Sequence, residues 1–399
     1  MKTKRRSFLS LAAAGGNATN AAALHAISAR GREAWEAENG FRGAPAFIPP
    51  PATDEVRISS NENPLGPGPA AVAALRGEYG SIMRYPMNAR ISGTDLRQRI
   101  GEMYGGKAAN VVLAPGSSEI LRNAVRVYTG PDRALVTGEC SYENPIRTAE
   151  YFGAPVKAIP MTGGLSLDLE KMAGASIGAG LVFLCNPNNP TGTVHSLADV
   201  TDFVKFVKKE SPYTAILLDE AYYDYVTHPS FDTGAELAMR HRDVFVGRTF
   251  SKAFGMAGLR VGYAFGQADT IARLAPLQLT FGTSILSIAA AMGSLEDPEY
   301  IRNEVKRNEA ARRYTLDFFS NHGLDPVPSE TNFVFVNIGR PAAEFRAACA
   351  ERGIFVGRDF PPYEKTHARI SIGTLDEMQR ATAVFAEVLG LAATDNQQQ

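Results

Sequence analysis

Residues 181–192 read LVFLCNPNNPTG, an apolar run of strand length that stops at an asparagine-rich turn bracketed by prolines. Two further stretches have the same form: residues 215–223 read AILLDEAYY, and residues 244–252 read VFVGRTFSK. Short continuous apolar runs are typical of strands that are buried on both faces of a parallel sheet. The three stretches therefore predict strands whose carboxyl ends carry polar side chains.

The middle of the chain alternates between such runs and stretches with helical periodicity, for example residues 120–128 and 197–208. This alternation predicts a mainly parallel sheet with helices on both faces. The strand-length runs are residues 111–113, 134–136, 181–185, 215–218 and 244–246.

After about Leu286 the pattern changes to a long charged helix at residues 298–321, followed by strands at residues 331–336 and 368–372. These elements predict a second, smaller α+β unit. We therefore expect an α/β fold with two domains and a disordered polar tail. Their expected bounds are 69–290 for the large domain, 291–392 for the small C-terminal domain and 393–399 for the tail.

The charge balance excludes some classes of partner. Lys and Arg number 41 against 42 Asp and Glu, so the 399-residue chain has a formal net charge of -1. A nucleic-acid or anionic-membrane partner would favour a basic surface, so we expect neither. The three cysteines, Cys140, Cys185 and Cys349, lie far apart and without metal-ligand spacing, so we expect packing residues, no disulfide framework and no metal site.

The N-terminus has the composition of a targeting segment. A basic start precedes a short apolar stretch and small residues, and residues 5–9, RRSFL, resemble the twin-arginine export motif. We expect residues 1–26 to be such a signal and the mature protein to be periplasmic; a cytoplasmic enzyme with a basic N-terminus is the alternative. The proline-containing residues 27–68 predict an extended N-terminal arm.

Residues 247–263 combine hydroxyls, glycines and three cations in one loop. Such a loop can bind a phosphate, for which Arg260 offers a planar fork. The Lys252 amine becomes a nucleophile toward an aldehyde if its pKa falls. A solvated basic face is the alternative for these residues taken alone.

The other two strand ends also carry candidate binding groups. An asparagine held between prolines, such as Asn189, can present its amide in a fixed direction, although a tight turn would also select it. A carboxylate directly after a buried strand, such as Asp219, is costly to bury without a cationic partner. A cationic heterocycle nitrogen would serve as that partner, and capping of the next helix is the alternative.

Together these windows resemble the fold-type I aminotransferases that use pyridoxal 5'-phosphate (PLP), and within them the histidinol-phosphate aminotransferase branch. The resemblance extends from about Ser59 to Ile372. It implies a PLP-dependent aminotransferase that moves an amino group between an L-amino acid, or a histidinol phosphate-like amine, and a 2-oxo acid. The other motifs that carry it are NENP at 61–64, RYP at 84–86, GSSE at 116–119 and ARISIG at 368–373.

The resemblance implies a role for each cofactor residue. Lys252 would form an aldimine with PLP and then act as general acid and base. Asp219 would pair with the ring nitrogen, and Tyr142 would stack on the ring. Asn189 and Tyr222 would bind the phenolic oxygen. The residues implied to bind the phosphate are Ser117, Ser118, Thr249, Ser251 and Arg260, together with Tyr85 from the neighbouring subunit of a homodimer.

The substrate residues follow less closely from the resemblance. Arg369 would grip the anionic group of the substrate, and Arg358 and Asn189 would assist. After Asn63-Pro64 the branch usually has a tyrosine that helps to hold the substrate phosphate, whereas this chain has Leu65. Histidinol phosphate and an amino acid with an apolar or aromatic side chain both remain open as substrates.

Two other functions remain to be distinguished from transamination. A PLP-dependent decarboxylase or lyase could use the same cofactor residues, but a salt bridge from Arg369 to an α-carboxylate would spare that carboxylate from cleavage. A non-catalytic aminotransferase-like sensor module is the other alternative. The chain lacks a helix-turn-helix pattern before the region of resemblance and is near neutral, which argues against a DNA-bound regulator.

Overall fold

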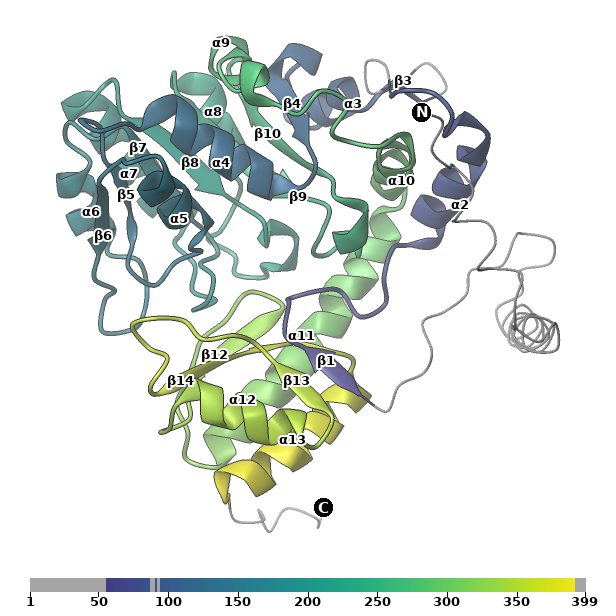
Figure 1. The fold of residues 1–399 in the computed structure, drawn as a ribbon, viewed down its shortest axis with the longest axis vertical. Coiled ribbons are helices and arrows are strands. Elements are labelled where there is room, and N and C mark those ends of the chain that lie inside the picture. The colour runs from purple at the N-terminus through teal and green to yellow at the C-terminus, as the bar shows by residue number, and fades with distance from the viewer. Residues whose placement is uncertain (1–54, 87–89, 92–93, 392–399) are drawn as a thin grey trace, which may run out of the picture. The chain divides into compact units, whose positions relative to one another are not determined.

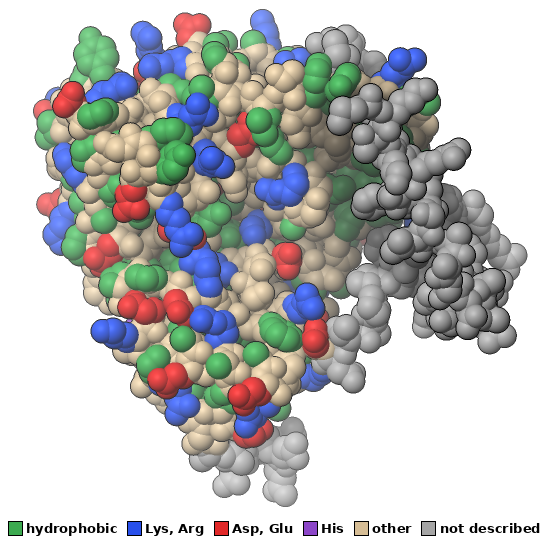
Figure 2. All heavy atoms as spheres, viewed as in Figure 1, with side chains coloured by type: hydrophobic (Ala, Val, Ile, Leu, Met, Phe, Trp, Pro, Cys, Tyr) green, Lys and Arg blue, Asp and Glu red, His purple; other side chains and the backbone are tan. Residues whose placement is uncertain are grey.

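The computed structural model describes residues 55–86, 90–91 and 94–391, which belong to one compact unit beginning at Glu55. The expected signal, most of the expected arm and the C-terminal tail lie outside these residues. Among the helices that the structure describes, none is both long and apolar enough to cross a membrane. Basic and acidic side chains are interspersed over the face shown in Figure 2.

A seven-stranded sheet forms the centre of the large domain, in the order β4-β10-β9-β8-β7-β5-β6 (Figure 1). Strand β10 pairs antiparallel with both of its neighbours, and the other pairings are parallel. The expected mainly parallel sheet is therefore confirmed. Its strands are β4 Val111–Ala114, β5 Leu135–Gly138, β6 Val156–Ile159, β7 Leu181–Cys185, β8 Ala215–Asp219, β9 Val244–Thr249 and β10 Gly262–Gly266.

Both faces of this sheet are covered, which explains why its strands lack polar alternation. Along β7, Phe183 and Cys185 pack into one core, while Val182 and Leu184 pack into the core on the opposite face. The helices that contribute to the first core are α4 Ser117–Tyr128, α5 Asn144–Tyr151 and α9 Ala268–Ala272. Those of the second core are α6 Leu169–Ala175, α7 Leu197–Glu210 and α8 Ala235–Arg240.

The small domain contains a three-stranded sheet and a two-stranded parallel sheet in which β1 pairs with β13. Strand β1 lies within the residues expected to form an arm. Val56 and Ile58 alternate with exposed Arg57 and pack into the small-domain core, so the expected arm contains an ordered strand. The elements are β1 Val56–Ile58, β11 Pro326–Val327, β12 Phe333–Asn337, β13 Ile354–Val356, β14 His367–Ser371, α12 Ala342–Ala350 and α13 Leu375–Leu389.

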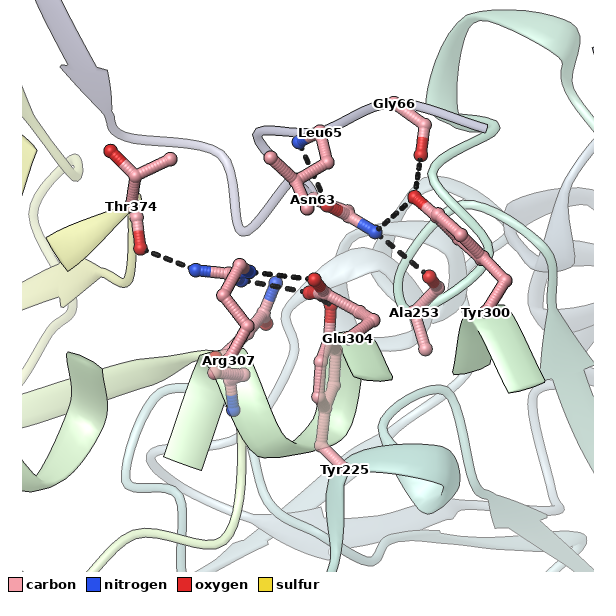
Figure 3. Close-up of polar contacts among 12 residues, drawn as sticks. Asn63, Leu65, Gly66, Tyr225, Ala253, Tyr300, Glu304, Arg307 and Thr374 are labelled. Carbon is pink, nitrogen blue, oxygen red and sulfur yellow. Dashed lines mark hydrogen bonds and ion pairs between the residues drawn. The ribbon is translucent and has the colours of Figure 1, made fainter. Parts of the chain in front are cut away.

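Helix α11, Pro298–Asn321, links the two domains, and Figure 3 shows polar contacts of its first half. Buried Glu304 accepts hydrogen bonds from Tyr225 at 2.9 Å and from Arg307 at 2.6 and 2.8 Å. Tyr300 accepts from Asn63 at 3.2 Å. These contacts fix α11 and the segment around Asn63 against the large domain. The remaining α-helices in the described residues are α2 Pro69–Gly77, α3 Leu96–Met103 and α10 Ile285–Leu295.

Candidate functional site

A cavity of about 540 Å³ lies where the carboxyl ends of the central strands meet the small domain. Cys185 pairs with Asp219, and Asp219 pairs with Gly247, so β7, β8 and β9 end side by side. Open α/β sheets bind ligands at this edge. Twelve predicted residues line the cavity: Ser117, Ser118, Tyr142, Asn189, Asp219, Tyr222, Thr249, Ser251, Lys252, Arg260, Arg358 and Arg369.

The remaining predicted residue, Tyr85, does not line the cavity. Its side chain is 71% exposed, and its ring stacks on that of Phe281 with 4.7 Å between centroids. This exposure leaves Tyr85 available to another molecule. The expectation that it serves the neighbouring subunit stays a prediction.

Asp219 presents a carboxylate to the cavity from the end of β8. The residue is 3% exposed, and within the described part of the chain its Oδ1 atom is buried without a hydrogen-bond partner. Burial raises its pKa to about 7. The 3₁₀ helix that follows, Tyr223–Tyr225, has Tyr222 at its N-cap, so Asp219 does not cap it. A buried unpaired carboxylate in a cavity wall suits a cationic ligand nitrogen.

Lys252 presents its amine to the same cavity. Its Nζ atom donates to the carbonyl of Ser60 at 3.2 Å. Burial, with the charge of Arg369 as the next cause, lowers the pKa of this amine to about 8. A larger fraction of the amine is therefore neutral near pH 7 than in an exposed lysine. A neutral amine is the form that attacks an aldehyde.

A third group of cavity residues supplies hydrogen-bond donors for an anion. Helix α4 begins at Ser117, and its N-cap, Gly116, has no side chain with which to bind the first amides. Arg260 donates to Ser251 Oγ at 3.2 Å, and Thr249 Oγ1 donates to the same atom at 2.9 Å. A helix N-terminus, hydroxyls and a guanidinium together suit a phosphate.

Gly116 is required by both its backbone and its surroundings. Its φ is 84°, and a Cβ atom there would lie 2.0 Å from Arg260 Nη2. Other residue types rarely adopt this φ, and none has room beside the guanidinium. The glycine thus allows Arg260 to approach the start of α4.

Arg369 reaches the cavity from β14 of the small domain. It donates to Asn189 Oδ1 and to the carbonyl of Ser59, each at 2.8 Å. Burial lowers its pKa to about 10, so it stays charged near pH 7. Its Nε atom has no hydrogen-bond partner among the described residues. Arg358, by contrast, forms an ion pair with Glu143 and lies over the Phe360 ring at 4.2 Å.

Sequence reasoning gave no role to several other lining residues, among them Ser60, Asn61, Glu62, Cys185 and Arg346. Asn61 belongs to the quoted NENP motif, and its positive φ of 55° marks a special position that composition does not reveal. Cys185 was predicted to be a packing residue. It is buried as expected, but its Sγ atom also lies 3.9 Å from Asp219 Oδ2. Only the pairing of β7 with β8 brings these two atoms together.

A family model described as aminotransferase class I and II matches residues 53–385. The chain belongs to this family. Histidinol-phosphate aminotransferase from Symbiobacterium thermophilum is 36% identical over 338 residues, which cover 84% of this chain and 91% of the relative. These similarities confirm the expected class of enzyme, a PLP-dependent aminotransferase.

Solved structures confirm the fold-type I architecture. A putative histidinol-phosphate aminotransferase from Erwinia carotovora atroseptica is 31% identical with a TM-score of 0.79, covering 86% of this chain and 98% of that chain. Histidinol-phosphate aminotransferase from Sinorhizobium meliloti, solved in complex with PLP, is 29% identical with a TM-score of 0.75, covering 90% of this chain and 94% of that chain.

The described cavity fits PLP in three respects. Asp219 supplies a carboxylate oxygen, Oδ1, that has no hydrogen-bond partner among the described residues and suits a ring nitrogen. Lys252 supplies an amine of lowered pKa for an aldehyde. The start of α4, with Arg260, supplies donors for a phosphate. The ring nitrogen, the aldehyde and the phosphate of the cofactor therefore each have a chemically matching partner in the cavity.

Proposed function

We propose that this aminotransferase exchanges an amino group between an amino donor that carries an anionic group and a 2-oxo acid, with Lys252 attached to PLP and Arg369 binding the anionic group. One observation carries the substrate assignment. Arg369 is a buried guanidinium with no carboxylate within ion-pair distance among the described residues, and it lines the same cavity as Lys252. A buried charge of this kind is costly unless a ligand pairs with it.

The cofactor residues divide by the part of PLP that they would contact. Asp219 would hold a proton on the ring nitrogen, and Tyr142 would stack on the ring. Tyr222 and Asn189 would donate to the phenolic oxygen. When bound, PLP supplies a ring that accepts electrons from the bond broken at the substrate Cα. The residues proposed for the phosphate are Ser117, Ser118, Thr249, Ser251 and Arg260.

Lys252 carries the proton during transamination. Its free amine would take a proton from the substrate Cα and would deliver it to the C4' atom of the cofactor. A pKa of about 8 suits both directions, because the amine accepts and releases a proton near neutral pH.

The identity of the amino donor depends on whether the residues around Leu65 can bind a substrate phosphate. Several relatives are named histidinol-phosphate aminotransferases, which makes histidinol phosphate one candidate. Leu65 is 55% exposed and does not line the cavity of its own chain. It offers no donor for a phosphate, so an amino acid with an apolar or aromatic side chain is the second candidate.

Decarboxylation is the principal rival to transamination on this scaffold. Arg369 would hold a carboxylate of the substrate and so spare it from cleavage. The Cα proton would then be the group left for Lys252 to remove, which favours transamination.

The test is spectroscopic. The purified protein loaded with PLP should show the visible band of a covalently bound cofactor, and a correct donor should bleach it while a 2-oxo acid forms. The panel should contain histidinol phosphate, L-glutamate and L-phenylalanine. Release of carbon dioxide without a 2-oxo acid would support the rival, and no bleaching with any donor would support the sensor alternative.

Lys252→Ala tests the covalent attachment directly. The variant should retain the fold but lose the covalent band, and activity should fall by about 10³-fold or more. Lys209→Ala is a suitable control, because Lys209 is an exposed residue of α7. A normal band in Lys252→Ala would overturn the role of Lys252.

We also propose that the chain acts as a homodimer in which Tyr85 binds the cofactor phosphate of the partner. The stacked rings of Tyr85 and Phe281 join two exposed apolar segments, and such patches are typical of interfaces. Mixing inactive Lys252→Ala and Tyr85→Ala subunits should restore about a quarter of the parental activity, since one site of each heterodimer would be complete. No recovery from mixed subunits would contradict shared sites. The exposed apolar side chains of these segments are Tyr79, Ile82, Met83, Tyr85, Leu279 and Phe281.

Export by the twin-arginine route remains a proposal that rests on the sequence of residues 1–26, which lie outside the described residues. The route carries folded proteins, which suits an enzyme that binds its cofactor before export. Fractionation with detection of the N-terminus would test it. Uncleaved protein confined to the cytoplasm would contradict it.

A further inference from the structure

The hydroxyl of Tyr222 receives two amide donors. Asn61 Nδ2 donates to it at 3.0 Å, and Asn189 Nδ2 donates to it at 3.3 Å. Two donors occupy the acceptor sites of the hydroxyl oxygen, so the hydrogen of Tyr222 cannot be given to either amide. That hydrogen is left for a third group, and Tyr222 lines the cavity.

Two residues of β14 fix the orientations of the Asn61 and Asn189 side-chain amides. Ser371 Oγ donates to Asn61 Oδ1 at 2.6 Å, and Arg369 Nη1 donates to Asn189 Oδ1 at 2.8 Å. An amide whose oxygen accepts from these donors must turn its NH₂ group the other way, toward Tyr222. Two residues of one strand thus set the direction of two hydrogen bonds to a residue of the large domain.

The Asn61 bridge is held rigidly. Asn61 is 1% exposed, and its backbone NH donates to Ser371 Oγ at 2.9 Å, so backbone and side chain contact the same hydroxyl. Two residues later, Asn63 donates to the carbonyl of Ala253 at 2.9 Å, a contact drawn in Figure 3. The segment is therefore anchored on both sides, and Asn61 has little freedom to reverse its amide.

We infer that Asn61 is a positioning residue that, together with Ser371, forces the Tyr222 hydroxyl to donate its hydrogen to the phenolic oxygen of PLP. This inference rests on the proposed contact of Tyr222 with that oxygen. The consequence is electrostatic. A hydrogen bond donated to an anionic oxygen stabilises the anion more than a neutral pair does. Asn61 thereby lowers the pH at which the bound cofactor loses its proton, because it orients the Tyr222 hydroxyl.

The arrangement also connects cofactor and substrate binding. Asn189 and Asn61 take their orientation from Arg369 and Ser371, which are two residues apart on β14. Arg369 is the residue proposed to bind the substrate. A substrate that binds Arg369 changes only the hydrogen bond from Arg369 to Asn189, because Ser371 and not Arg369 orients Asn61. The hydrogen bond from Asn61 to Tyr222 therefore does not depend on the substrate.

The experiment measures the midpoint of the pH-dependent absorbance change of the PLP-loaded protein. Asn61→Gly removes the amide while suiting the positive φ of 55°. Asn61→Asp keeps the shape but replaces the donor with an acceptor, so Tyr222 turns its hydrogen away from the cofactor. We expect the midpoint to rise by about 0.5 to 1 pH unit in Asn61→Gly and by more in Asn61→Asp. Ser371→Ala should raise it as well, since it frees the Asn61 amide to reverse.

A double-mutant cycle separates this inference from the role of Tyr222. Tyr222→Phe should raise the midpoint, and adding Asn61→Gly to it should have no further effect, because the two residues act through one hydroxyl. A shift in Tyr222→Phe with none in Asn61→Gly would overturn the inference and leave the proposed function standing. An unchanged midpoint in Tyr222→Phe would overturn both the Tyr222 contact and this inference.

Asn110→Asp serves as the matched control. Asn110 is a buried asparagine that donates to the carbonyl of Gly266 at 2.9 Å and accepts from the Lys107 amide at 2.9 Å, away from the cavity. The same chemical change there should lower stability without moving the midpoint. An equal shift in Asn110→Asp would assign the effect to general destabilisation and overturn the inference.

Discussion

Arg369 Nη1 lies 2.8 Å from Asn189 Oδ1, and this hydrogen bond joins the small domain to the end of β7 in the large domain. It places the proposed substrate-binding guanidinium beside the proposed cofactor-binding amide. The two residues are 180 positions apart in the chain. The reaction site is therefore a product of the contact between domains.

Replacing Arg369 tests the anion-binding role. We expect Arg369→Lys to lower kcat/KM for the preferred donor by about 10- to 100-fold, because an ammonium cannot reproduce bidentate contact with a carboxylate. The loss should appear mainly in KM, measured by steady-state kinetics. Arg352→Lys, a change in an exposed arginine paired with Glu387, should be neutral. An unchanged KM in Arg369→Lys would contradict the proposed grip.

The Asp219 carboxyl predicts a pH-dependent stability in the cofactor-free protein. Burial raises its pKa from 3.8 to about 7, so between these values the folded state binds the proton more tightly than the unfolded state. Stability from this group is present at low pH and lost as the pH rises through about 7. Because an amide cannot be charged, Asp219→Asn should stabilise the apoprotein at pH 8, on the order of 2–4 kcal/mol, and change little at pH 4.

Thermal or denaturant unfolding of both apoproteins at several pH values measures this difference. The same substitution should impair the PLP-loaded enzyme, because an amide cannot hold a proton on the ring nitrogen. A loss of apoprotein stability at pH 8 would contradict the account of Asp219 as a buried, unpaired carboxylate.

Gly116→Ala should weaken PLP binding. Its Cβ would lie 2.0 Å from Arg260 Nη2, so the guanidinium must leave the start of α4. We expect the dissociation constant for PLP to rise by more than about 10-fold, measured by fluorescence or absorbance titration. Gly105→Ala is the matched control, because Gly105 also has a positive φ, of 71°, but a Cβ there meets nothing within 4 Å. Equal losses in both variants would attribute the effect to backbone strain alone.

Glu143→Gln tests the proposed assistance by Arg358. The ion pair with Glu143 holds this guanidinium and offsets its charge. Once released, Arg358 can pair with a second anionic group, so kcat/KM for a dicarboxylic or phosphorylated donor should rise several-fold relative to that for an apolar amino acid. Arg147→Gln is the control, since Arg147 is the other partner of Glu143, at 4.0 Å. An unchanged ratio would indicate that Arg358 does not face the substrate.

The central strands were predictable because their burial leaves a direct mark on the sequence. Residues 181–185 form β7 and residues 298–321 form α11, both with the bounds that the sequence predicted. Strand β10 was not predicted, since its five residues, Gly262–Gly266, contain two glycines and follow the cofactor loop without a clear apolar run. Strand β1 was also missed, because it is stabilised by contacts distant in sequence, namely its pairing with β13 and the small-domain core.

The candidate site was largely predictable for a similar reason. Lys252, Asp219 and Asn189 each follow a buried strand, and parallel strands end at one edge of their sheet. Asn61 could not be assigned a role in this way, because its contacts with Tyr222 and Ser371 are 161 and 310 residues away in sequence. A motif can indicate that such a residue matters, but it does not show which residues it contacts.

The sequence by itself determined the alternation of strands and helices in the middle of the chain, the chemical types at the strand ends and the class of cofactor those types suit. These features follow from local periodicity and from residue chemistry. Only the tertiary structure decided that, among the described residues, Asp219 Oδ1 lacks a hydrogen-bond partner and Arg369 lacks a counter-ion, and which way the Tyr222 hydroxyl must point. Those properties depend on distances and desolvation between residues hundreds of positions apart, which no local pattern encodes.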